Sequence, residues 1–250
     1  LNPEAYDPEY HFNLAIDAGL SAFAAPLGLI ETCASSYAGQ IPLILKINSS
    51  NSLSRNSDAP TQAITGSIYE AIRLGCSAIG FTIYPGSDDS LNMISEIQEL
   101  AVEAKSLGLA VVVWSYPRGG NISKEGETAV DIVSYAAHMA ALIGAHIIKV
   151  KPPTEFLEDT NAKKVYVDNK IPISTLRDRI KNVVESCFQG KRIVIFSGGS
   201  AKNIEGLLNE IREIYNGGGF GSIIGRNSFQ RPKKEALVLL SQIIDIYKGK

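Results

Sequence analysis

The sequence predicts an α/β fold and, within that class, a (β/α)8 TIM barrel. Short apolar runs rich in β-branched residues alternate with amphipathic helical stretches, which is typical of repeated strand–helix–strand units on a parallel sheet. Several predicted helices end in a glycine just before the next strand, at Gly19, Gly75, Gly108 and Gly144. The length of 250 residues fits one such barrel, so we expect a single domain over residues 1–250.

Seven segments are predicted to be strands: residues 22–25, 43–47, 78–83, 110–114, 146–150, 193–196 and 222–224. A helix at about residues 8–18 precedes the first of them. An eight-stranded barrel needs one more strand before that helix, and the chain opens with Leu1 rather than Met. We therefore expect the first strand to be missing from this sequence. A flavodoxin-like open sheet is the alternative, but it usually has fewer strands.

Composition narrows the class of partner. A hydrophobic content of 45% and a net charge of −2 are typical of a globular protein, and they give no reason to expect nucleic acid or an anionic membrane as partner. The apolar runs are too short to cross a bilayer. Cys33, Cys76 and Cys187 are an odd, scattered set without the spacing of metal ligands. We expect a cytoplasmic protein.

The fifth predicted strand ends in two lysines, in the segment Ala-His-Ile-Ile-Lys-Val-Lys that ends at Lys151. Lys149 and Lys151 are two residues apart, so both side chains are predicted to point to the same side of the strand. In a parallel barrel that side is the interior of the C-terminal mouth, where catalysis takes place. Burial and the nearby like charge would each lower the pKa of an amine, which favours Schiff-base chemistry.

An aromatic pair follows the preceding strand, in the segment Trp-Ser-Tyr-Pro-Arg-Gly-Gly. Trp114 and Tyr116 are again two residues apart and share a face. A tyrosine hydroxyl at the mouth can relay a proton, especially if nearby ammonium groups lower its pKa. The alternative is that both rings simply cap the core. With the lysine pair on the next strand, we favour a functional role.

The last two predicted strands end in Phe-Ser-Gly-Gly and Ile-Gly-Arg-Asn, each just before a helical stretch. Backbone N–H groups of Gly198, Gly199 and Gly225 could converge on an anion there, and Arg226 adds a positive charge suited to phosphate. Tight turns also need glycine. The pairing of the two turns with an arginine favours a phosphate site.

Lys46, at the end of another predicted strand, would also face the mouth. It would bind a second phosphate or tune Lys149, unless it is simply a solvated lysine. Two polar loops, residues 48–60 and 152–174, follow strands on the same face. They are predicted to be lids or, equally, mobile surface loops or oligomer contacts.

Several kinds of chemistry are disfavoured by what the sequence contains. Of the three histidines, His11 and His138 fall on predicted helices, and His146 begins its strand at the end opposite the mouth. No cluster of histidines would line the active face, which argues against a zinc-dependent aldolase or hydrolase. The sequence has no dinucleotide-binding fingerprint, no Walker-type loop and no nucleophile elbow. We therefore expect neither a metal nor any other cofactor.

Together these motifs, with Gly-Arg-Asn-Ser-Phe-Gln-Arg at residues 225–231, resemble the archaeal-type class I fructose-1,6-bisphosphate aldolases, which also occur in bacteria. The resemblance implies that Lys149 forms the Schiff base, that Tyr116 is the general acid/base and that Trp114 shapes the pocket. It also implies a substrate phosphate held by Ser197, Gly198, Gly199, Gly225 and Arg226. The family carries an Asp-x-Gly-x-Glu-His type segment at the end of its first strand, and this sequence contains no match to it.

The implied reaction cleaves fructose 1,6-bisphosphate to dihydroxyacetone phosphate and glyceraldehyde 3-phosphate, or runs in reverse. Lys149 attacks the ketone, loss of water gives an iminium ion, and the C3–C4 bond breaks once Tyr116 takes the C4 hydroxyl proton. One alternative is a related Schiff-base aldolase or thiolase that acts on another small phosphorylated ketone or sugar. Another is a non-catalytic barrel that binds a sugar phosphate or serves as a scaffold. The resemblance also implies a homo-oligomer.

Overall fold

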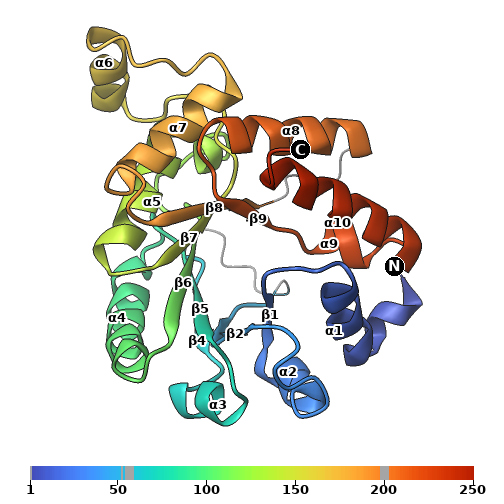
Figure 1. Cartoon of the computed structure of the whole chain (residues 1–250). Helices are drawn as coiled ribbons and strands as arrows, with labels where there is room; N and C mark the ends of the chain where they lie inside the picture. The colour runs from blue at the N-terminus through green and yellow to red at the C-terminus, as the bar shows by residue number, and fades with distance from the viewer. Residues whose placement is uncertain (1, 52, 54–58, 198–202) are drawn as a thin grey trace.

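The computed structural model describes residues 2–51, 53, 59–197 and 203–250. Within these residues, seven parallel strands form one curled sheet with helices on its outer side (Figure 1). In spatial order the strands are β1 (Phe23–Pro26), β2 (Leu43–Lys46), β5 (Ala78–Ile83), β6 (Ala110–Ser115), β7 (Ile147–Val150), β8 (Ile193–Ser197) and β9 (Gly221–Ile223). Spatial order follows chain order, as repeated strand–helix–strand units require. All seven strands were predicted from the sequence.

The helices of the described residues lie between consecutive strands and at the two ends of the chain. In order they are η1 (Pro3–Tyr6), α1 (Pro8–Asp17), α2 (Leu27–Cys33), α3 (Ile68–Arg73), α4 (Ser90–Ser106), η2 (Gly126–Thr128), α5 (Val130–Leu142), α6 (Thr160–Asp168), α7 (Leu176–Ser186), α8 (Ile204–Asn216), α9 (Arg226–Phe229) and α10 (Lys233–Tyr247). Several helices begin after a residue whose side chain caps the first turn. The side chains of Asp7, Ser67 and Thr175 each accept a hydrogen bond from an N–H group in the first turn of the helix that follows.

The strands alternate between two apolar environments. Ile79, Phe81 and Ile83 of β5 pack in the large core under the helices. Ala78 on the same strand packs instead with Ile44 of β2 and with Val112 and Trp114 of β6 inside the curl, where Ala24, Ile147 and Ile223 join them. Contact among side chains from both ends of the sheet shows that the sheet wraps around this inner cluster.

The chain ends meet on one side of the molecule. Tyr10 and Leu14 of α1 pack against Ala236 and Leu240 of α10 in a separate apolar cluster, and the two helices lie beside each other in Figure 1. β1 and β9 are the two ends of the sheet. The described residues thus supply seven of the eight strands expected for a closed barrel.

The two polar loops fold differently from each other. In the first, β3 (Asn48–Ser49) pairs antiparallel with β4 (Ala63–Ile64), a small hairpin that the sequence analysis did not predict. The rest of this loop falls partly outside the described residues. In the second, helix α6 projects beyond α7 (Figure 1), and the Tyr166 hydroxyl donates a hydrogen bond to Asn182 Oδ1 at 2.6 Å.

The three histidines lie away from the C-terminal ends of the strands. His146 precedes β7, and its Nδ1 accepts a hydrogen bond from Val111 N at 3.0 Å. His11 Nε2 lies 2.9 Å from Ala5 O, and His138 Nδ1 lies 2.7 Å from Ser186 O. These positions are the ones expected from the sequence. No helix in the described part of the chain combines the length and apolar character that a membrane crossing requires.

Candidate active site

Lys149 lies inside the curled sheet near the C-terminal end of β7. It pairs in register with Trp114 of β6, and its Nζ is 5.7 Å from the Trp114 ring centroid. The residue is only 8% exposed. Burial disfavours the ammonium form and lowers the pKa of Lys149 to about 8. With a pKa of about 8, roughly a tenth of this amine is uncharged and nucleophilic at pH 7, far more than for an ordinary lysine.

A second ammonium group occupies the same interior. Lys46 Nζ, from the end of β2, lies 5.9 Å from the Trp114 ring centroid. Burial and then the charge of Lys149 lower the pKa of Lys46 to about 8. Asn48 is 1% exposed and fixes this lysine: its Oδ1 accepts from Lys46 Nζ at 2.7 Å and from Thr82 N at 2.8 Å. The like charge beside Lys149 thus comes from β2.

Lys151 directly follows the strand and is held by a carboxylate. β7 ends at Val150, and Lys151 Nζ forms an ion pair with Glu127 Oε2 at 3.2 Å. Glu127, next to α5 in η2, also accepts from Lys124 Nζ at 2.8 Å. Because the strand has ended, alternation of side chains no longer controls where Lys151 points. The carboxylate holds its ammonium group instead.

Tyr116 follows β6 and lies beside Lys149, whose Nζ is 6.0 Å from the tyrosine ring centroid. The sequence analysis expected cations to lower the pKa of this phenol. Burial raises the pKa of Tyr116 more than the neighbouring Arg118 guanidinium lowers it. At neutral pH the hydroxyl therefore keeps its proton, and Tyr116 is poised as a proton donor.

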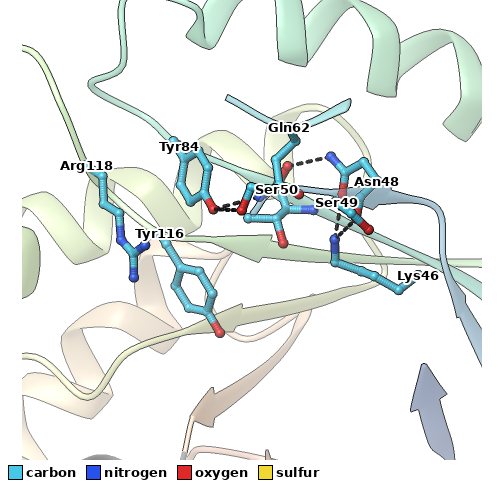
Figure 2. Close-up of a pocket in the computed structure, with 9 residues that line it drawn as sticks. Lys46, Asn48, Ser49, Ser50, Gln62, Tyr84, Tyr116 and Arg118 are labelled. Atoms are coloured by element: carbon cyan, nitrogen blue, oxygen red, sulfur yellow. Dashed lines mark hydrogen bonds between the residues drawn. The ribbon is translucent and has the colours of Figure 1, made fainter. Parts of the chain in front are cut away.

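A cavity of about 320 Å³ opens next to these residues. Figure 2 shows its lining side chains, among them Lys46 from the end of β2 and Tyr116 and Arg118 from the segment after β6. The remaining lining residues are Asn48, Ser49, Ser50, Gln62, Thr82 and Tyr84. Arg118 lies over two rings, with its Cζ 5.5 Å from the Tyr84 centroid and 5.9 Å from the Tyr116 centroid.

The sequence analysis did not select Asn48, Gln62, Thr82, Tyr84 or Arg118 as site residues. Arg118 is two residues after Tyr116, and Tyr84 directly follows β5, so the ends of strands gave a signal for both. Gln62 gave none, because it reaches the cavity from within the loop that joins β3 to β4, a hairpin that was not predicted.

The predicted phosphate segments follow β8 and β9. Ser197 is the last residue of β8 and is half-buried; Gly198 and Gly199 lie outside the described residues. Gly225 precedes the first residue of α9, and Arg226 is exposed. Ser197 pairs in register with Ile223, so the two strand ends lie side by side. The described geometry therefore places the ends of the two predicted segments next to each other.

Within the described residues, no group of three or more His, Cys, Asp or Glu side chains has an arrangement that could hold a metal ion. The polar groups of the described cavity are instead one amine, a guanidinium, amides and hydroxyls. This set of groups suits proton transfer, carbonyl addition and anion binding.

Comparison with known proteins decides the family. Residues 3–231 match the model of the DeoC/LacD family of aldolases. The chain belongs to this family. It is 35% identical to the class 1 fructose-bisphosphate aldolase of Thermoproteus tenax over 251 residues, which cover all of this chain and 83% of that protein. The predicted resemblance to class I fructose-bisphosphate aldolases is confirmed, and with it the lyase class.

This aldolase-family chain also has a solved structural relative. An archaeal fructose-1,6-bisphosphate aldolase, whose catalytic lysine is covalently bound to the carbinolamine intermediate of its substrate, matches with a TM-score of 0.82 and 32% sequence identity. The match covers 99% of this chain and 86% of that one. The predicted TIM-barrel class is thereby confirmed. A further relative, from Methanocaldococcus jannaschii, is 32% identical over 96% of this chain and 72% of its own length. Its name is fructose-bisphosphate aldolase/6-deoxy-5-ketofructose 1-phosphate synthase.

Proposed function

We propose that this protein is a class I, metal-independent fructose-1,6-bisphosphate aldolase with Lys149 as the Schiff-base residue and Tyr116 as the general acid/base. One observation carries the proposal: a buried amine with a pKa of about 8 lies inside the sheet, next to a protonated tyrosine. An uncharged lysine in such a place adds to a carbonyl, whereas an ordinary lysine remains an ammonium ion.

The first step forms the iminium ion. The neutral Lys149 amine attacks the C2 ketone of the substrate and gives a carbinolamine. Its hydroxyl must leave as water, and this requires a proton. Tyr116 supplies it, because burial keeps the phenol protonated until that moment. The products of this step are an iminium cation, a water molecule and a tyrosinate.

The second step breaks the carbon–carbon bond. The Tyr116 phenolate takes the proton of the C4 hydroxyl, the C3–C4 electron pair moves toward the iminium, and glyceraldehyde 3-phosphate leaves. Arg118, 5.9 Å from the Tyr116 ring centroid, stabilises the transient phenolate. The resulting enamine is reprotonated, and hydrolysis releases dihydroxyacetone phosphate and restores the amine.

The substrate phosphates need positive groups on either side of the reacting carbons. We assign one phosphate to the turns after β8 and β9, with Ser197, Gly198, Gly199, Gly225 and Arg226 as its ligands. Trp114 shapes the pocket floor between Lys149 and Lys46. Lys46 contributes charge beside the reacting centre, and Lys151 contributes from the rim, where Glu127 holds it.

Reductive trapping tests the proposal. Borohydride is added to the protein with dihydroxyacetone phosphate, and the adduct is located by peptide mass spectrometry. The wild type should carry one adduct on Lys149, and Lys149→Met should carry none. Lys46→Met is the matched control, because it removes the other interior amine and should still be modified at Lys149. A wild type without an adduct, or with its adduct elsewhere, would exclude this mechanism.

A second substrate is a reasonable alternative, since the M. jannaschii relative is also named a 6-deoxy-5-ketofructose 1-phosphate synthase. Such an enzyme would use the same lysine on a different phosphorylated ketone. Cleavage rates for a panel of phosphorylated ketoses distinguish the two, and we expect fructose 1,6-bisphosphate to give the highest kcat/KM. The other two alternatives are a thiolase that acts on a phosphorylated ketone and a non-catalytic barrel that binds a sugar phosphate. Neither would cleave any of these ketoses.

We further propose that the protein acts in the cytoplasm, in glycolysis or gluconeogenesis, as a homo-oligomer. Apolar side chains such as Leu91, Tyr135 and Val238 are more than half exposed on the outer helices, and such groups are often covered by a second subunit. Light scattering of the purified protein measures the assembly directly, and a monomeric mass would contradict this part of the proposal.

A further inference from the structure

Two buried polar side-chain atoms of the described residues have no hydrogen-bond partner, and both belong to the same cavity. They are Gln62 Oε1 and Arg118 Nε, from residues that line the cavity beside Lys46 and Tyr116. A buried acceptor or donor without a partner costs about 1–3 kcal/mol. A buried atom of this kind needs an explanation, such as a bound water, an ion or a catalytic role. Arg118 Nε nevertheless lies 3.9 Å from Glu127 Oε2, in an ion pair, so the atom that is left to pair with a ligand is the acceptor Gln62 Oε1.

The Gln62 carboxamide is held in place by its other end. Its Nε2 donates a hydrogen bond to the Tyr84 hydroxyl at 2.6 Å, and Gln62 is 8% exposed. Tyr84 itself is 6% exposed, and the Arg118 guanidinium covers its ring. The Tyr84 hydroxyl can also donate, so either orientation of the amide keeps a hydrogen bond to it. In the orientation described, Nε2 bonds Tyr84 and Oε1 is left to accept from a ligand that donates an O–H or N–H group.

The neighbouring residues indicate which part of a ligand lies here. Tyr116 and Lys46 line the cavity and both lie beside Lys149, so these two side chains connect the cavity with the reacting centre. The Arg118 guanidinium, elsewhere in the cavity lining, favours an anionic group on the ligand. A short chain with a hydroxyl between the reacting carbon and a phosphate matches this order of groups.

We propose that Gln62 is a specificity-determining residue that accepts a hydrogen bond from the hydroxyl of the aldehyde half of the substrate. The inference rests on the proposed aldolase function. In that reaction Tyr116 takes the proton of the C4 hydroxyl, and the aldehyde half has one further hydroxyl, on C5. That group becomes the 2-hydroxyl of glyceraldehyde 3-phosphate. Gln62 would make the enzyme distinguish this aldehyde from one without the hydroxyl.

The condensation reaction tests this directly. Dihydroxyacetone phosphate is combined with either glyceraldehyde 3-phosphate or 3-oxopropyl phosphate, the same aldehyde without its 2-hydroxyl. The ratio of the two kcat/KM values measures recognition of the hydroxyl. We expect the wild type to favour the hydroxylated aldehyde by about tenfold to a hundredfold, since a site built to bind a hydroxyl rejects analogues that lack it.

Gln62→Met keeps the length of the side chain and removes the acceptor. In this variant the ratio of the kcat/KM values for the two aldehydes should fall at least tenfold, toward one. Gln40→Met is the matched control, because Gln40 is exposed and bonds only locally, through Nε2 to Ser36 O at 3.2 Å, so that its ratio should equal that of the wild type. Tyr84→Phe is a second variant that leaves Gln62 in place but removes its anchor, and its ratio should also fall.

The outcomes are separable. If Gln62→Met loses activity equally with both aldehydes, the ratio stays constant, Gln62 is merely structural, and the inference is wrong. The same conclusion follows if Gln62→Met does not fold and Tyr84→Phe keeps the wild-type ratio. Borohydride trapping of dihydroxyacetone phosphate on Lys149 does not involve the aldehyde half. A trapped adduct with an unchanged ratio therefore rejects only this inference, whereas absence of the adduct rejects the proposed function itself.

Discussion

At the scale of single residues, the candidate site depends on burying amines next to each other. Lys149 and Lys46 approach the Trp114 ring to 5.7 Å and 5.9 Å, and burial lowers both pKa values to about 8. The indole between them offers a surface that tolerates a cation. The same burial raises the pKa of Tyr116 and keeps its phenol protonated. One environment thus prepares a nucleophile and an acid together.

The pH dependence of trapping follows from the Lys149 pKa. The neutral amine is the reactive form, and its fraction rises as pH increases through the pKa. The rate of adduct formation on Lys149 should therefore increase up to about pH 8 and level off above it. The adduct on Lys149 is quantified after a short exposure to borohydride at a series of pH values below and above pH 8. A rate that still rises tenfold per pH unit well above pH 8 would mean that Lys149 has an ordinary lysine pKa of about 10.5.

Substitution of the two neighbouring lysines should separate their roles. Repulsion between two ammonium groups is mutual, so Lys46→Met should raise the Lys149 pKa and move the midpoint of the trapping profile to higher pH. Lys151→Met should leave the midpoint in place, because Lys151 pairs with Glu127. The same trapping assay measures both variants. The reverse pattern would mean that Lys151, as its spacing in the sequence suggested, is the residue that tunes Lys149.

At the scale of elements, the position of Trp114 depends on a glycine in the adjacent strand. Gly80 of β5 pairs with Val112 of β6, and a Cβ at Gly80 would lie 2.3 Å from Trp114 Cζ3. No real Cβ tolerates such a contact with a ring that is itself buried. The missing side chain therefore makes room for the indole beside the two lysines.

Gly80→Ala should destabilise the protein by about 1–3 kcal/mol through overpacking and should displace the ring. Trp114 is the only tryptophan, so urea unfolding followed by its fluorescence reports both effects. Gly28→Ala is the control: Gly28 lies in α2 with open space around its Cα, and the change should be neutral or slightly stabilising. Equal stability of Gly80→Ala and the wild type would show that the indole adjusts without cost.

At the scale of the whole molecule, one apolar core extends from Phe12 of α1 to Ile246 of α10 and encloses the three cysteines. Burial raises the pKa of Cys76 and Cys187 to about 11. Thiolates are therefore scarce in the folded protein. The cysteines belong to the packing of the fold and lie outside the candidate site.

Thiol titration reports the integrity of this core. Cys33, Cys76 and Cys187 should react with an aromatic disulfide reagent only when the protein unfolds, so that the reaction rate follows the urea-dependent population of unfolded or opened molecules. Absorbance of the released thiolate gives the rate. Immediate reaction of any cysteine without denaturant would contradict the burial described here.

Local pattern was enough to determine the seven strands of the sheet, their alternation with helices and the placement of the histidines. Apolar periodicity and turn glycines act over a few residues, so the sequence contains them directly. It also identified Lys149, Tyr116 and Trp114 as residues at strand ends. The tertiary structure decided which groups surround them. Strand pairing brings Lys46 to Lys149, Glu127 takes Lys151, and Gln62 reaches the cavity from the loop of a hairpin. Contacts of this kind depend on strand order, register and burial, which no local stretch of sequence encodes.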